Sequence, residues 1–108
     1  MKIIWMLVNC NTEQEATKIG KLILRARLAS CFDMVPRLAA YYFWPPRKNR
    51  IEKTKGCILI LETMPPYVKR IEMLVKNIHS DALPFTGSIG LNDVNPAYIR
   101  WMKKELTK

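Results

Sequence analysis

Two uninterrupted apolar runs constrain the fold of this chain more than any other feature of its sequence. They occupy residues 2–9, centred on Ile3–Val8, and residues 57–61. Continuous runs of this length are typical of β-strands covered on both faces, because both rows of side chains are then removed from water. The sequence therefore predicts two central strands of one sheet. Neither run approaches the ~20 residues that a membrane-spanning helix needs, so we expect no membrane partner.

Amphipathic helices and further strands are expected around these two runs. Thr12 is followed by Glu15 three residues later, which is a capping-box signature for the start of a helix. Gly20 costs that helix about 1 kcal/mol relative to Ala, and we expect close packing against the sheet to compensate. Pro36 cannot donate a ladder hydrogen bond, so its strand is expected to lie at an edge or to bend there. The expected elements are strands at 2–9, 31–44, 51–63 and 85–91, helices at 13–29 and 65–79 with Thr63 capping the latter, and a last helix opened by Asn95-Pro96.

The order of these elements predicts an α+β fold. Strand, helix, strand, strand, helix and strand follow one another, which is the order of a ferredoxin-like β-α-β-β-α-β sandwich. The two uniformly apolar strands are the first and third, which are central in that arrangement. A long hairpin joins the second and third strands, and an extra helix ends the chain. At 108 residues the chain is expected to form one domain, 1–108.

The chain is strongly basic, and the predicted hairpin tip concentrates that charge. The 18 basic and 9 acidic residues give a formal net charge of +9. Five cations gather at or near the tip: Arg47, Lys48, Arg50, Lys53 and Lys55. Aromatic residues precede them at 41–44, and rings beside cations are typical of a nucleic-acid surface. An RNA-recognition module of this topology would need an aromatic residue on the third strand, and 57–61 has none. A solvated tip that prevents edge-to-edge aggregation explains the same charge.

Catalytic motifs are absent, whereas metal-ligating residue types are present. The sequence contains no phosphate loop, nucleophile elbow or paired histidines, so we expect no enzymatic activity. Three cysteines without paired spacing favour a reducing cytosol over a disulfide framework. Three residues of these types stand at element ends: Cys10 ends the first strand, Cys31 starts the second strand, and His79 ends the second helix. Thiolate and imidazole ligands suit copper or zinc, although the set lacks the close pairs of a structural zinc site. No cofactor is required by this interpretation.

Several short motifs resemble those of the CutA divalent-ion-tolerance proteins. Arg27–Cys31 resembles the R-L-A-A-C segment of that family, and Ala40–Trp44 resembles its S-x-Y-x-W strand. His79 and the proline five residues later match the frame of H-P-Y-x-x-P-E. Asn95–Trp101 resembles the closing N-x-x-Y-x-x-W. Each motif is weak alone, but together they run in order over nearly the whole chain.

The resemblance implies a cytosolic, non-enzymatic homotrimer associated with tolerance of copper and other divalent ions. Its long hairpins would pair with neighbouring subunits. Trimer formation would also bury the rings at 41–44, which would otherwise form a large exposed apolar patch. If the protein binds metal, Cys10 and His79 are the first candidate ligands.

The resemblance further implies a cleft between subunits, and this sequence departs from the family there. The cleft residues expected here are Tyr42, Trp44, Glu62 and Asp81. Glu62 stands where the family has lysine, Gly56 where it has an acid, and Ser80-Asp81 where it has Pro-Tyr. The scaffold is therefore expected to be kept while the chemistry of the cleft has changed. An alternative remains open, in which a trimer binds an anion, a nucleotide or RNA as a signalling module through the basic tip.

Overall fold

The predicted element order is confirmed by the computed structural model, which describes residues 2–106. The elements are β1 (Ile3–Cys10), α1 (Glu13–Arg25), β2 (Cys31–Phe43), β3 (Ile51–Thr63), a 3-10 turn η1 (Pro65–Tyr67), α2 (Val68–Ile78), β4 (Thr86–Leu91) and α3 (Pro96–Glu105). The fold is a ferredoxin-like α+β sandwich with an extra C-terminal helix. Among the helices of residues 2–106, none is long and apolar enough to cross a bilayer.

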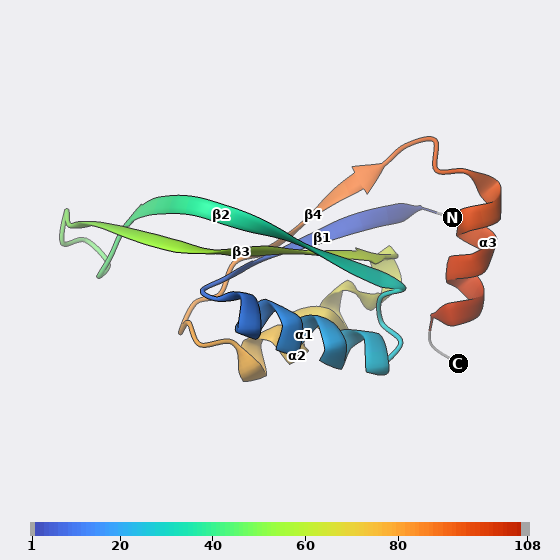
Figure 1. Cartoon of the computed structure of the whole chain (residues 1–108), viewed down its shortest axis with the longest axis horizontal. Coiled ribbons are helices and arrows are strands. Elements are labelled where there is room, and N and C mark those ends of the chain that lie inside the picture. Colours follow the sequence, from blue (N-terminus) through green and yellow to red (C-terminus); the bar gives the residue numbers. More distant parts are fainter. Residues whose placement is uncertain (1, 107–108) are drawn as a thin grey trace.

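One four-stranded antiparallel sheet organises the chain. Its strand order is β2-β3-β1-β4, so β1 and β3 are central as predicted. Helices α1 and α2 lie together on one face, and the β2–β3 hairpin projects far beyond them (Figure 1). Pro36 lies on edge strand β2 opposite Cys57, and the register shifts between Arg37 and Ala40. The expected edge position of this proline is therefore confirmed.

The core lies between the sheet and the two helices. It is built from the inward row of β1 and β3 and the apolar stripes of α1 and α2, with Met6, Val8, Leu59, Leu61, Ile19, Ile23, Ile71 and Val75 fully buried. A second, smaller cluster of Ile3, Met64, Met102 and Leu106 attaches α3 to the start of β1. Asn95 caps α3 by accepting a hydrogen bond from the Tyr98 amide at 2.8 Å. Trp101 on this helix is 43% exposed.

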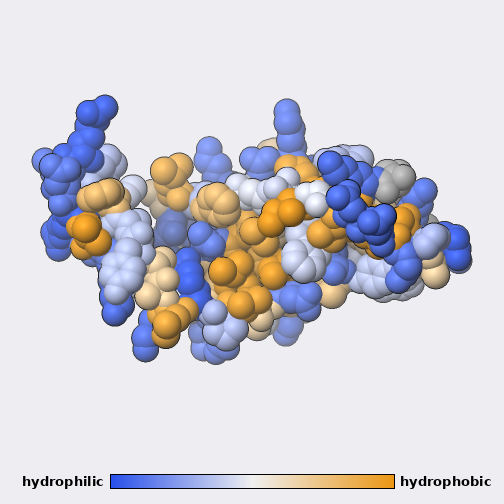
Figure 2. Space-filling model, turned by 90° about the horizontal axis from the view of Figure 1, so that it is seen from above, coloured by the Kyte–Doolittle hydropathy of each residue, from blue (hydrophilic) through white to orange (hydrophobic). Residues whose placement is uncertain are grey.

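The opposite face of the sheet carries no layer of its own. Leu7 lies opposite Ile60, and Val35 lies opposite Ile58, so these side chains share that face. They are half-buried or exposed, whereas the inward rows of the same strands are buried. Figure 2 shows this side of the molecule, with hydrophobic side chains gathered over its middle. We call this surface the open sheet face. Both faces of β1 and β3 were expected to be covered, but one chain covers only one.

Helix α1 ends four residues earlier than the sequence predicts. The amides of Arg27 and Leu28 bond back to the carbonyls of Leu24 and Ile23, at 2.9 and 3.2 Å. This pattern is a Schellman motif, which needs a left-handed residue just past the helix end. Arg27 occupies that position with φ 59°. Glycine usually takes this place, so its absence hid the stop signal.

The predicted capping role of Thr63 is wrong. Thr63 is the last residue of β3 and is fully buried. Its hydroxyl donates a 2.6 Å hydrogen bond to the Leu28 carbonyl, which ties β3 to the segment after α1. Met64 precedes the η1 turn and offers no side-chain cap. The Leu28 carbonyl satisfies the hydrogen-bonding need of the buried Thr63 hydroxyl as well as a helix amide would have done.

Gly20 provides the first testable prediction. A Cβ added there would lie 2.7–2.8 Å from the ring atoms of Phe32, so the close packing expected from the sequence is present. Gly20→Ala should lower the free energy of unfolding by about 1–3 kcal/mol through overpacking, although alanine is the better helix former by about 1 kcal/mol. Urea denaturation measures the change.

Lys21→Ala on the exposed side of the same helix is the matched control, and we expect a change within about 0.5 kcal/mol. Adding Phe32→Leu to Gly20→Ala should recover part of the loss. Stabilisation by Gly20→Ala alone would show that the ring and the helix are not in close contact.

Candidate functional site

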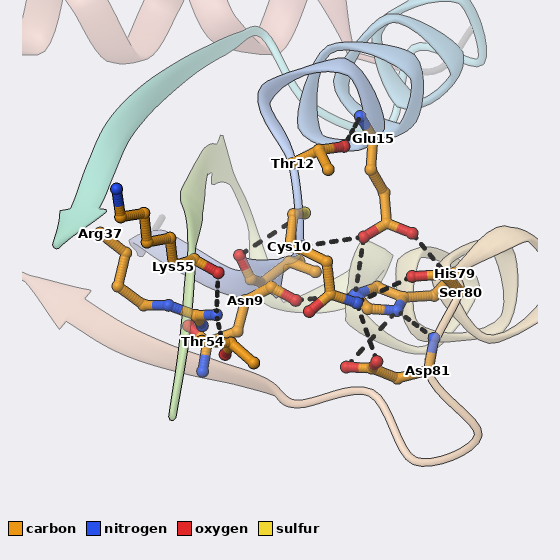
Figure 3. A network of polar contacts seen from close by, with 12 residues as sticks. Asn9, Cys10, Thr12, Glu15, Arg37, Thr54, Lys55, His79, Ser80 and Asp81 are labelled. Carbon is orange, nitrogen blue, oxygen red and sulfur yellow. Dashed lines mark hydrogen bonds and ion pairs between the residues drawn. The ribbon is translucent and has the colours of Figure 1, made fainter. Parts of the chain in front are cut away.

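Three metal-ligating side chains of different kinds meet at one edge of the sandwich. Cys10 ends β1, Glu15 lies in the first turn of α1, and His79 follows the last residue of α2. Their ligand atoms all lie within 4.8 Å of one another. The sequence singled out Cys10 and His79 without establishing that they converge in one chain, which they do. We refer to these three residues as the Cys10 cluster, and Figure 3 shows them with their neighbours.

Glu15 joins the cluster as a residue that the sequence analysis assigned only to capping. The Thr12 hydroxyl accepts from the Glu15 amide at 3.0 Å, as the capping box predicts. The carboxylate reaches further than a capping box requires, because it accepts from the amides of Asn11 and Ser80 at 2.9 and 2.8 Å. Burial opposes ionisation of this carboxyl, but the hydrogen bonds from Asn11 and Ser80 and the nearby His79 outweigh it and lower the pKa. The sequence signal that could have added Glu15 to the candidate ligands was its place in the first helical turn after Cys10.

His79 is held by two backbone groups. Its Nε2 lies 2.7 Å from the carbonyl oxygen of Asn9, and its Nδ1 accepts from the Asp81 amide at 2.9 Å. A backbone amide can only donate, so the ring proton must sit on Nε2, where it donates to Asn9. The side chain is completely buried. The ring therefore joins the end of β1 to the segment after α2.

The Cys10 thiol is protonated at neutral pH. Burial raises its pKa to about 12, and the negative charge of Glu15 adds to the shift. Its Sγ lies 3.9 Å from the Val8 carbonyl. Cys57 lies opposite Cys10 on β3. Cys31 is the first residue of β2 and lies opposite Glu62 on β3. All three cysteines are free.

The donor set of the Cys10 cluster fits a soft or borderline divalent cation. One sulfur, one carboxylate and one imidazole nitrogen resemble the mixed sets that hold zinc or copper with a further position open. Binding would require the thiol proton to leave. For His79 to ligate through Nε2, which faces the Glu15 carboxylate at 3.7 Å, the ring proton would have to leave Nε2, at the expense of both backbone hydrogen bonds of the ring. These two costs would reduce the affinity.

The predicted cleft residues divide between two places in a single chain. Tyr42, Trp44 and Asp81 line one pocket of about 620 Å³. Glu62 lies elsewhere, where its carboxylate accepts from the Tyr98 hydroxyl and from Trp5 Nε1. The hydrogen bond to Glu62 raises the pKa of the Tyr98 hydroxyl. Glu62 therefore anchors α3 to β1 and β3 within the chain.

The cations of the basic tip lie apart from the pocket that holds Tyr42 and Trp44. Arg47 and Lys48 are exposed, and Arg50 Nε pairs with Glu52 at 2.9 Å. The Lys53 ammonium lies 5.6 Å from the centre of the Tyr41 ring. None of the five predicted anion-binding cations, Lys55 included, lines the pocket that holds Tyr42 and Trp44.

Glu15 gives the second prediction, which concerns stability. Because its folded-state pKa is lowered, the stabilisation is complete above the unfolded value of 4.5 and is lost as the pH falls through the folded value. Glu15→Gln should lower the free energy of unfolding by about 1–2 kcal/mol at neutral pH, since one amide loses a charged acceptor. Denaturant titrations from neutral pH into acid should show a weaker pH dependence for the variant. Glu13→Gln, in the same helical turn, should keep the wild-type pH dependence.

Comparison with known proteins places this geometry in a family. The family model described as "CutA1 divalent ion tolerance protein" matches residues 4–105. A Danio rerio relative named "Protein CutA homolog" is 33% identical over 94% of this chain. The chain spans 66% of that relative's length and 52% of the mouse and human proteins named CutA.

Solved structures agree with the fold. The crystal structure of CutA1 from Oryza sativa superposes with a TM-score of 0.91 at 19% identity, and the match covers 100% of this chain and 96% of that one. The protein from Archaeoglobus fulgidus named "Periplasmic divalent cation tolerance protein CutA" has a TM-score of 0.88 at 20% identity, covering 95% of this chain and 97% of its own. The sequence motifs, the topology and the family match agree, and the chain belongs to the CutA1 divalent ion tolerance family.

Proposed function

We propose that this chain is a homotrimeric, non-enzymatic protein of one domain that binds divalent copper or zinc and contributes to tolerance of these ions. The observation that carries the proposal is the Cys10 cluster, in which sulfur, oxygen and nitrogen ligands lie within 4.8 Å of one another. The description of the family as divalent ion tolerance proteins supports the same function.

Cys10, Glu15 and His79 would hold the ion. A bound divalent cation offers a Lewis acid, but the proposed role here is capture rather than turnover. The carboxylate is ionised at neutral pH, and the imidazole is uncharged in its present hydrogen bonds. Cys10 is the residue that must change state, because only the thiolate ligates. Cation affinity should therefore depend on pH chiefly through this thiol.

Zinc affinity gives the third prediction. Cys10→Ser should weaken zinc binding about tenfold or more, since one of three ligands is lost. In the wild type the affinity should rise about tenfold for each pH unit from about pH 7 to about pH 8.5, because the thiol loses its proton on binding well below its pKa of about 12. Competition with a chromogenic chelator under reducing conditions measures both effects.

Cys31→Ser is the matched control, because it removes one thiol outside the cluster. It should keep the wild-type affinity and pH dependence. Equal zinc affinity in Cys10→Ser and Cys31→Ser would contradict the proposed ligand set.

The trimer is supported by surfaces that a single chain leaves in water. The open sheet face exposes Val35 and Ile89 and leaves Leu7 and Ile60 half-covered. The aromatic residues 41–44 are also exposed, from 42% at Tyr42 to 66% at Tyr41. Soluble monomers rarely expose so large a contiguous apolar surface. Three copies that place their open sheet faces against one another would bury that face with closed symmetry.

Val35→Lys on the open sheet face tests the trimer and is the fourth prediction. A charge there would have to be buried unpaired between subunits, whereas in one chain the position is exposed. Light scattering should give about 38 kDa for the wild type, three times 12.6 kDa, and a smaller mass for the variant. Met73→Lys is the control: Met73 is an exposed residue of α2, and this variant should keep the wild-type mass. A wild-type mass of 12.6 kDa would refute the trimer.

A cytoplasmic location completes the proposal. Its support is the three free cysteines, of which Cys10 and Cys57 are buried as thiols. Free thiols persist in reducing compartments, where a structural disulfide is not needed for stability. Fractionation of cells that express the native chain would test the location directly.

A further inference from the structure

Arg37 is a partly buried cation whose position depends on the glycine at position 56, which has no side chain. It lies on β2, at the first position of the register shift that ends at Ala40. Its guanidinium lies over β3 at Gly56. A Cβ on Gly56 would be 2.6 Å from Arg37 Nη2 and 2.4 Å from the Cys10 carbonyl oxygen. Glycine at position 56 therefore makes room for the guanidinium, where the family pattern has an acid.

The hydrogen bonds of this guanidinium are incomplete. Nη2 donates to the Lys55 carbonyl at 3.3 Å and to the Thr54 hydroxyl at 3.5 Å. The buried Nε has no partner among residues 2–106, and no carboxylate in that range lies within ion-pair distance of Arg37. A buried donor on a charged group without a partner is destabilising unless something completes it. Nε is itself out of reach of a ligand, so an oxyanion in the neighbouring pocket would be held through the terminal nitrogens of the guanidinium, which can hold two oxygens at once.

Arg37 also lines the pocket that contains Tyr42 and Trp44, so an anion at Arg37 would have rings beside it. The remaining wall includes the Asn9 side of β1 and Phe85, which is 53% exposed. Flat apolar surfaces beside a cation favour a ligand with a planar ring. The pocket of about 620 Å³ is large enough for a small organic molecule.

Among residues 2–106, Asp81 is the one carboxylate that lines this pocket, and one of its oxygens accepts a hydrogen bond. Its Oδ1 accepts from the Asn11 amide nitrogen at 2.8 Å, and its Oδ2 lies 3.9 Å from His79 Nδ1. Figure 3 shows Arg37 and Asp81 on opposite sides of Asn9. An oxyanion at Arg37 would therefore lie away from this negative charge.

We propose that the Arg37 pocket binds a small organic oxyanion, a carboxylate or a phosphate ester carried on a planar ring. The guanidinium of Arg37 holds the anionic group, and the rings of Tyr42 and Trp44 contact the planar part. This site adjoins the Cys10 cluster but uses none of its three side chains, and it uses none of the cations of the basic tip. It needs no metal, so it can be tested whether or not the cluster binds one.

Calorimetric titration of the protein tests the proposal with four probes: phenyl phosphate, benzoate, inorganic phosphate and benzyl alcohol. Phenyl phosphate or benzoate should bind at least tenfold more tightly than benzyl alcohol, which lacks the charge, and than inorganic phosphate, which lacks the ring. The tighter of the two charged aromatic probes identifies the preferred anion. In NMR spectra the Arg37 Nε–H resonance should move on binding.

Arg37→Gln should weaken the tighter aromatic probe at least tenfold, and Arg37→Lys, which keeps the charge but loses the planar fork, should weaken it severalfold. Arg47→Gln removes the same charge from the exposed tip and should change affinity less than twofold. Equal binding by Arg37→Gln and Arg47→Gln would overturn the proposal, as would binding of neither charged aromatic probe. Dissociation of the oligomer by both Arg37 variants, without binding of either probe, would assign Arg37 to a carboxylate of another copy and overturn it as well.

Discussion

The central constraint on this molecule is that β1 and β3 are apolar on both faces while one chain supplies only one layer of helices. Burial of apolar surface is the largest favourable contribution to folding, so the inward rows against α1 and α2 define the core. The outward rows, with Leu7 and Ile60 among them, gain nothing from that layer. The same strands thus form a buried core on one face of the sheet and leave an apolar surface on the other, which the proposed trimer would cover.

The chemistry lies at the ends of elements that this sheet positions. Cys10 lies at the last position of β1, and the turn into α1 places Glu15 beside it. The end of α2 then delivers His79 to the same edge, where the Asn9 carbonyl receives the ring. Each group is held by a bond that also serves the fold. A cation bound as proposed would therefore have to compete with hydrogen bonds that Glu15 and His79 already make.

Periodicity and topology predicted most of the fold, because they depend on which side chains leave water. The central strands, the edge position of Pro36 and the close packing at Gly20 all followed from that reasoning. The end of α1 did not, because its stop depends on a left-handed backbone at Arg27, and arginine gives no such signal. Thr63 was misassigned because a hydroxyl suits either a helix cap or a buried carbonyl partner.

The candidate site was predicted only in part, for a related reason. Cys10 and His79 stood out by residue type, whereas Glu15 was already explained by its cap. Arg37 could not be recognised from sequence, since its importance arises from the space above Gly56, forty-six residues after Cys10 in the chain but adjacent to it in the sheet. Contacts between neighbouring strands determine which side chains form such a site, and these contacts cannot be predicted from one sequence alone.

The left-handed arginine that ends α1 links two distant parts of the chain. Arg27 Nη1 donates to the Glu105 carbonyl at 3.1 Å and lies 3.6 Å from its carboxylate. Glycine would relax the backbone at this position but would leave the last turn of α3 without that tether. The Arg27 side chain thus connects the end of α3 to the turn that ends α1. The unfavourable left-handed backbone of Arg27 is accompanied by contacts between these two helices that glycine could not make.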